Sequence, residues 1–153
     1  MSRYEDITSE EVKVLIARVI DTHFSDLANV KIKFLFDTKK STRNGRIALG
    51  KCQKPNELTK HFTVSEAKDE EGYQYVIILD KLAYENMEDV DRVRLIRHEL
   101  RHILVVRDDQ AETVKYKIMP HNIDDFIEEV NLNGDDPEWA RRIGKMVGLL
   151  YKK

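Results

Sequence analysis

Residues 88–105, EDVDRVRLIRHELRHILV, form the strongest helical pattern in the chain. Apolar residues recur in this segment every three or four positions, as they do on the buried face of an amphipathic helix. These residues are Val90, Val93, Ile96, Leu100 and Leu104. We therefore expect one long helix over residues 88–105 that packs against the rest of the fold through this apolar stripe.

The same segment holds the sequence His98-Glu99-Leu100-Arg101-His102, in which two histidines are four positions apart. On a helix this spacing stacks both imidazoles on one face, one turn apart, so that both can reach a single metal ion. Glu99 lies about 100° further round the helix, where its carboxylate can reach a water molecule beside the metal. Zinc lowers the pKa of such a water to about 7, and a neighbouring carboxylate can accept its proton. The pattern predicts a zinc site with Glu99 as general base; the alternative is two surface histidines flanked by ion pairs.

A catalytic zinc site needs a third protein ligand, with the fourth position left for water. Glycine and histidine three and six residues after the second histidine would mark the metzincin class, but Val105 and Asp108 occupy these positions and exclude it. Asp108 itself is a candidate ligand, and a glutamate from a following helix, Glu128 or Glu129, is another. His121 is the preferred candidate, because it precedes a predicted helix that a short connection can fold back over the metal helix. The alternative for His121 is an exposed histidine at the start of that helix.

The segments on either side of the metal helix predict an α+β fold. Residues 46–52 are expected to form a hairpin-like pair with the strand before them, whereas residues 58–67 fit neither a helix nor a strand clearly. The order of helix, strands and then helices predicts a single domain over residues 1–153 with a small, mostly antiparallel sheet. The predicted helices cover residues 8–24, 81–86, 88–105, 122–130 and 137–151, and the predicted strands cover residues 30–36, 46–52 and 73–79.

The composition fits a folded protein with little overall charge: 41% of the residues are hydrophobic, 35% are charged and the net charge is −2. The charge is distributed unevenly along the chain. Seven basic residues lie within segment 39–60 with a single acid, Glu57, whereas segment 124–138 holds seven acids and no base. The basic segment is a candidate contact surface for nucleic acid, although two solvated faces of opposite charge explain the pattern as well.

Cysteine usage and hydropathy limit the compartments that fit this chain. Cys52 is the only cysteine, which excludes an intramolecular disulfide and a cysteine-rich metal site. The acidic N-terminal segment MSRYEDITSEEVK does not fit a secretory signal, and no apolar run approaches the roughly 18 residues that span a bilayer. We therefore expect a soluble, cytoplasmic protein without membrane contacts.

Four segments together resemble a family of phage and archaeal metallopeptidases with the HExxH motif, which is broadly similar to SprT-like zinc proteases. The segments are GKCQKPNELTKHF (residues 50–62), YVIILDK (75–81), RHELRHI (97–103) and MPHNIDDF (119–126). The resemblance implies a compact zincin-like domain with His98, His102 and His121 as zinc ligands and Glu99 as base. One departure is Asn122, at a position where we expect aspartate in many relatives.

Three functions are consistent with these patterns. The first is a zinc-dependent metallopeptidase, whose peptide or protein substrate adds as a strand to an exposed sheet edge above the metal helix. The second is a metal-dependent nucleic-acid hydrolase that uses the basic segment 39–60, and the third is a non-catalytic, zinc-stabilised module that binds nucleic acid or protein. Glu99 favours the first, because a purely structural zinc usually has four protein ligands and needs no such carboxylate.

Two further features each have a functional and a structural explanation. Arg94, Arg97 and Arg101 form a basic stripe that could hold a carboxylate or phosphate group, although pairing with acids such as Asp91 and Asp108 on a solvated face is the simpler explanation. Tyr116 could donate a hydrogen bond to the oxyanion formed during hydrolysis, although packing is again simpler.

Overall fold

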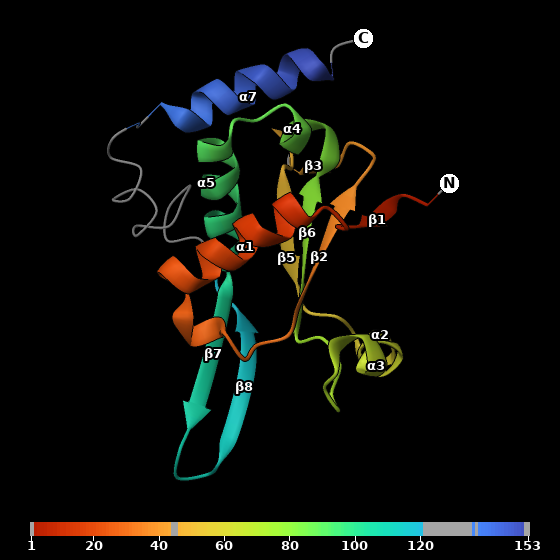
Figure 1. The fold of residues 1–153 in the computed structure, drawn as a ribbon, viewed down its shortest axis with the longest axis vertical. Coiled ribbons are helices and arrows are strands. Elements are labelled where there is room, and N and C mark those ends of the chain that lie inside the picture. The colour runs from red at the N-terminus through yellow and green to blue at the C-terminus, as the bar shows by residue number, and fades with distance from the viewer. Residues whose placement is uncertain (1, 44–45, 121–135, 137, 152–153) are drawn as a thin grey trace.

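A four-stranded sheet lies at the centre of the computed structural model, which describes residues 2–43, 46–120, 136 and 138–151 (Figure 1). The strands follow the order β1-β2-β6-β5. Their bounds are β1 Tyr4–Asp6, β2 Ile32–Asp37, β6 Tyr75–Asp80 and β5 Gly50–Gln53. The pair β2–β6 is parallel, whereas β1–β2 and β5–β6 are antiparallel, so the prediction of a mostly antiparallel sheet in an α+β fold is confirmed.

The predicted hairpin-like pairing of residues 46–52 with the strand before them is wrong, because β6 lies between β2 and β5. Strand β6 takes this central place because it is apolar on both faces. Ile77 and Leu79 are fully buried on one face, and Ile78 is 6% exposed on the other. Residues Arg46–Ile47 form instead the short strand β4, which pairs with β3, Thr42–Arg43.

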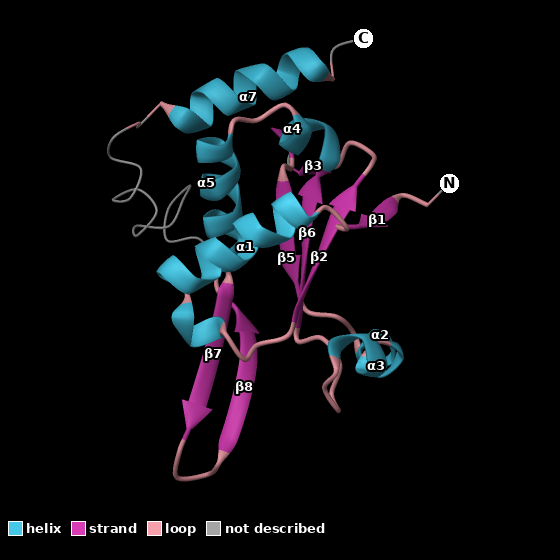
Figure 2. Cartoon of the chain, in the orientation of Figure 1, coloured by secondary structure: helices cyan, strands magenta, loops and turns pink. Residues whose placement is uncertain are grey.

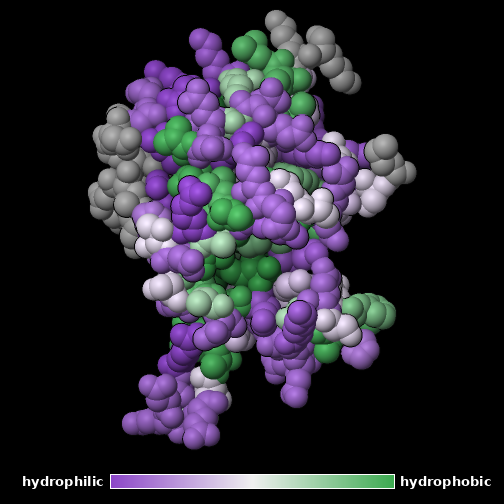
Figure 3. Space-filling model, in the orientation of Figure 1, coloured by the Kyte–Doolittle hydropathy of each residue, from purple (hydrophilic) through white to green (hydrophobic). Residues whose placement is uncertain are grey.

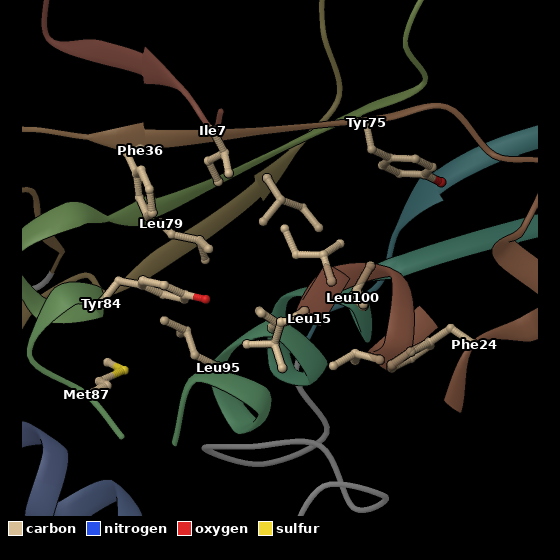
Figure 4. Close-up of a cluster of buried hydrophobic side chains, with 14 of the residues drawn as sticks. Ile7, Leu15, Phe24, Phe36, Tyr75, Leu79, Tyr84, Met87, Leu95 and Leu100 are labelled. Atoms are coloured by element: carbon tan, nitrogen blue, oxygen red, sulfur yellow. The ribbon is translucent and has the colours of Figure 1, made fainter. Parts of the chain in front are cut away.

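Two helices cover one face of the sheet and enclose the main core (Figure 2). Helix α1, Glu10–His23, is capped by Ser9, whose side chain accepts a hydrogen bond from the N–H of Val12, and it confirms the helix predicted over residues 8–24. Helix α5, Asp89–Leu100, packs against both α1 and β5. Figure 4 shows side chains of the core converging from α1, α5, β2, β6 and α4, Lys81–Glu85.

The helix predicted over residues 88–105 is shorter than expected. Helix α5 ends at Leu100, and Val90, assigned to the buried stripe, is 47% exposed. Residues Ile103–Asp108 form strand β7, which pairs with β8, Thr113–Ile118, in an antiparallel hairpin that projects from the body of the fold (Figure 1). The β-branched run of β7 pairs with alternating apolar residues of β8, so this segment is more stable as a strand than as a last turn of helix.

Residues 58–67, for which the sequence indicates neither a helix nor a strand clearly, lie in two short helices. These are α2, Glu57–Phe62, which begins at the side-chain cap Asn56, and α3, Val64–Ala67. Gly72 closes the loop before β6 at a φ of +74°, and a Cβ there would lie 2.1 Å from the carbonyl oxygen of Lys60. Glycine is required at this position by both the backbone conformation and the close approach.

The C-terminal helix α7, Trp139–Leu150, packs across the N-terminal end of α5 and over α4 (Figure 1). Ile143 and Val147 are buried in this contact, and the Tyr151 hydroxyl donates to Asp80 Oδ2 at 2.7 Å. The helix predicted over residues 137–151 is thus confirmed, whereas the helix predicted over residues 122–130 lies outside the described residues.

The remaining element of the described chain is a single 3-10 turn at Ser25–Leu27, which follows α1. In the part of the chain that the structure describes, no helix combines the length and the apolar character needed to cross a membrane. The face shown in Figure 3 is mostly hydrophilic, with hydrophobic residues gathered where the body meets the β7–β8 hairpin. That residues 1–153 form one domain stays a prediction.

Candidate metal centre

The end of helix α5 brings three potential metal ligands together. His98 and Glu99 lie in its last turn, and His102 follows two residues after its end. Each of the three side chains offers one ligand atom, and these atoms lie within 4.8 Å of one another. The imidazole rings of His98 and His102 have centroids 5.5 Å apart and an interplanar angle of 75°. The i, i+4 relation is kept because Arg101 still has helical backbone angles, although the helix ends before His102.

The orientation of His102 is set by two hydrogen bonds to Met119. His102 Nδ1 lies 2.8 Å from the Met119 carbonyl oxygen, and the Met119 N–H donates to the carbonyl oxygen of His102 at 2.6 Å. Because a carbonyl oxygen can only accept, Nδ1 carries the proton in this contact. A histidine whose Nδ1–H is bonded to a backbone carbonyl in this way has Nε2 as its potential metal-binding atom, an arrangement that metal-binding histidines commonly adopt.

Glu99 is held against strand β5 by a close approach to Gly50. The Glu99 residue is only 4% exposed. A Cβ at Gly50 would lie 2.8 Å from Glu99 Oε1 and 2.9 Å from both Cδ and Cγ. Any side chain larger than hydrogen at Gly50 would therefore move the carboxylate, so this glycine is part of the site.

These residues line a cleft of about 780 Å³ between β5, the end of α5 and the end of β8. Cys52 of β5 belongs to the same wall, where burial and the negative charge of Glu99 raise the pKa of the thiol to about 12. Strand β5 is an edge strand, so its outer backbone groups are not paired within the four-stranded sheet. The lining residues are Thr42, Gly50, Lys51, Cys52, Gln53, His98, Glu99, His102, Ile118, Met119 and Pro120.

The candidate third ligands have different places in the chain. His121, Glu128 and Glu129 lie outside the described residues, so the preference for His121 stays a prediction. Asp108 lies at the far end of β7, six residues beyond His102, which in an extended strand is about 20 Å. Its Oδ1 accepts hydrogen bonds from the N–H groups at 110 and 111, which gives Asp108 a role in the hairpin turn.

The arginine stripe predicted beside the histidines does not form an open basic surface. The guanidinium of Arg94 pairs with Asp91 at 3.0 Å, as the simpler explanation predicts, but Arg94 is 3% exposed, so the expected solvated face is wrong. Arg97 is buried, and the guanidinium of Arg101 stacks over the ring of Phe24 at 4.6 Å.

Tyr116 and the basic segment 39–60 also had both a functional and a structural explanation, and the structure bears only on Tyr116. Tyr116 packs edge-on against Tyr75, with ring centroids 6.1 Å apart, which supports the packing explanation. A nucleic-acid contact through segment 39–60 stays a prediction.

Gly50 and Met119 are the site residues that the sequence did not reveal. A glycine at a strand edge can indicate a close backbone approach, so Gly50 carried a weak signal. Met119 acts through its backbone carbonyl and amide, and no side-chain pattern could have identified it.

Comparison with known proteins gives one match. A family model described as "Putative phage metallopeptidase" matches residues 4–150. No curated protein and no solved structure shows a significant match to the chain. The description of that family implies a hydrolase that uses a metal ion, and the cluster of His98, Glu99 and His102 is a suitable place for one.

Proposed function

The chain belongs to the family of putative phage metallopeptidases, and from this premise we propose that it is a zinc-dependent peptidase whose centre is the cluster at the end of α5. His98 and His102 are the two ligands from the described chain, and His121 is the proposed third. The described chain reaches the cleft at Met119 and Pro120, immediately before His121 in the sequence. The observation that carries the proposal is the close cluster of two imidazoles and a buried carboxylate on a cleft of about 780 Å³.

The donor set supports zinc as the metal. Imidazole nitrogen is a preferred ligand of zinc, and three protein ligands with one open position are typical of its catalytic sites. Because Nδ1 of His102 faces the Met119 carbonyl oxygen, Nε2 would be the ligand atom of this residue. A zinc ion held there supplies Lewis-acid chemistry, which polarises a carbonyl group and acidifies water.

Glu99 is the proposed general base. Its carboxylate accepts a proton from water during attack on the peptide carbonyl and returns this proton to the leaving nitrogen. Its burial and its contact with the Gly50 backbone keep the carboxylate close to the two histidines. A fixed position matters because the proton must be transferred over a hydrogen-bond distance.

The outer edge of β5, which pairs with no strand of the described sheet, is the proposed place for the substrate backbone. Gly50–Gln53 are at the end of the sheet order and line the cleft that contains Glu99. An extended peptide can pair with such an edge through its own N–H and C=O groups, which favours peptides over substrates without a regular backbone. The scissile bond would then lie above the end of α5.

The substitution Glu99→Gln tests this proposal. It keeps the size of the side chain and removes the basic carboxylate, so we expect retained zinc content and loss of hydrolysis of labelled casein and of a mixed fluorogenic peptide library. The matched control is Glu88→Gln, which makes the same change at an exposed residue at the other end of α5. Unchanged hydrolysis by Glu99→Gln would contradict the mechanism, and the absence of any hydrolysis by the zinc-loaded chain would contradict the peptidase function.

A further inference from the structure

Tyr75, the first residue of β6, connects the sheet to the β7–β8 hairpin through its hydroxyl group. The residue is 0% exposed. Its hydroxyl lies 2.8 Å from the carbonyl oxygen of Lys117 and 3.2 Å from that of Leu104, which are opposite each other in the hairpin. Figure 4 shows the hydroxyl directed toward the hairpin, at the end of the core away from Tyr84. The single hydroxyl proton is thus donated to the hairpin backbone, with the shorter contact to Lys117.

The hairpin in turn holds His102. Met119 follows β8, two residues after Lys117, and makes both hydrogen bonds that orient His102. The Met119 carbonyl accepts from His102 Nδ1, and the Met119 N–H donates to the His102 carbonyl. A continuous path of hydrogen bonds and backbone therefore leads from the Tyr75 hydroxyl to the imidazole of a proposed metal ligand.

Among the described residues, Ile103, Val105 and Tyr116 join the hairpin to the main core, and the Tyr75 hydroxyl adds a polar contact to this junction. A two-stranded hairpin is only marginally stable by itself. Of its residues, only Ile103 is buried, and Val106 and Val114 are 39% and 45% exposed. The position of Met119 relative to α5 therefore depends on the contacts between the hairpin and the body, and the Tyr75 hydroxyl is one of the groups that make them.

We propose that Tyr75 is a positioning residue for the metal centre: its hydroxyl anchors the hairpin and so keeps the Met119 carbonyl in place to orient His102. The ring of Tyr75 is packed in the core, where phenylalanine would fill the same volume. A buried hydroxyl is costly unless it is hydrogen-bonded, so its presence needs a reason beyond packing. Burial also raises the pKa of Tyr75 to about 12, so the hydroxyl keeps the proton that it donates. The consequence for metal binding rests on the proposed function, whereas the coupling between Tyr75 and His102 does not.

The test compares Tyr75→Phe with Tyr84→Phe in the full chain. Tyr84→Phe removes the same group from another buried tyrosine, 2% exposed, at the other end of the core. Two readouts need no metal: the fraction of His102 protonated at Nδ1, from the nitrogen shifts of ¹⁵N-labelled histidine, and the hydrogen exchange rate of the Met119 amide. The third readout is the affinity for Zn²⁺ in competition with a chromophoric chelator.

We expect Tyr75→Phe to lower the Nδ1-protonated fraction of His102, to speed exchange at Met119 and to weaken zinc affinity by about tenfold. We expect Tyr84→Phe to leave all three as in the unsubstituted chain. An unchanged His102 tautomer and an unchanged Met119 exchange rate in Tyr75→Phe would overturn the inference. If both of these change and the unsubstituted chain binds no zinc, the positioning role stands and the proposed function fails.

Discussion

Replacing Gly50 by alanine introduces a methyl group into the contact between β5 and Glu99. The new Cβ would lie 2.9 Å from both Cγ and Cδ of Glu99 and 2.8 Å from Oε1. Carbon atoms in contact are normally about 3.5–4.0 Å apart, so the side chain must move by more than about half an ångström. Rotation of the carboxylate alone cannot relieve the overlap, because Cγ is among the atoms affected. Glu99 is 4% exposed, so there is little free space for it to enter.

We expect two measurable results from Gly50→Ala. Overpacking of this kind costs about 1–3 kcal/mol in the free energy of unfolding, which lowers Tm by about 2–4 °C for each kcal/mol. Displacement of the base by a distance approaching 1 Å lowers the hydrolytic rate by up to about 100-fold. Zinc content should remain as in the unsubstituted chain, since no histidine atom is among the three nearest to the added methyl group. Thermal unfolding, metal analysis and peptide hydrolysis measure these three quantities.

The control is the same substitution where there is room. A Cβ at Gly144, in helix α7, has nothing within 4 Å. Gly144→Ala should therefore raise the free energy of unfolding by about 0.5–1 kcal/mol, because alanine has the higher helix propensity, and leave hydrolysis unchanged. If Gly50→Ala has the stability and activity of the unsubstituted chain, Glu99 is not held against β5 and the reasoning is refuted.

Three further predictions concern charge and burial. The hydrogen bond from the Arg3 guanidinium lowers the pKa of Asp37. The pair therefore stabilises the fold above about pH 4, the usual pKa of a carboxyl group, and this stabilisation is lost as the pH falls further. In Asp37→Asn the free energy of unfolding, measured in urea between pH 2 and pH 6, should depend less steeply on pH. Burial raises the pKa of Cys52 to about 12, so iodoacetamide at pH 8 should label it far more slowly in the folded chain than in urea, and equal rates would contradict its burial. Asp91 is 3% exposed and pairs with the buried Arg94. Asp91→Ala should therefore lower the free energy of unfolding in urea by about 2–3 kcal/mol. A decrease of less than about 0.5 kcal/mol would show that the pair contributes little.

Local patterns in the sequence were sufficient for the longer elements up to residue 100, but not for β1, the pair β3–β4 or the short helices α2 and α3. The stripe of α1, the alternation in β2 and the apolar run in β6 are local patterns, and these three elements were predicted correctly. The pairing of β5 with β6 could not be predicted in this way, because it joins strands that are more than 20 residues apart. The parallel pairing of β2 and β6 could not be predicted from local patterns either. It depends on the burial of both faces of β6, which is a property of the whole fold.

The end of α5 shows why the hairpin was missed. Leu100 and Leu104 have helical spacing, so they fit a continued stripe, although Leu104 belongs to β7. The alternation of Val114, Tyr116 and Ile118 with lysines does indicate a strand, but it follows a polar segment that obscures the pairing. His98 and His102 come together whether the helix ends at Leu100 or continues to residue 105, because their spacing requires only one helical turn. The two hydrogen bonds between His102 and Met119 depend on the position of the hairpin, so they could be found only in three dimensions.

Zinc content measured on the chain purified without chelators tests the central claim most directly. We expect about one zinc per chain, as for other catalytic sites of this type, and much less in His98→Ala and in His102→Ala. His23→Ala is the matched control, because it removes a histidine at the end of α1 that is not part of the cluster. A chain that carries no zinc, and takes up none when it is reconstituted with Zn²⁺, would contradict the account.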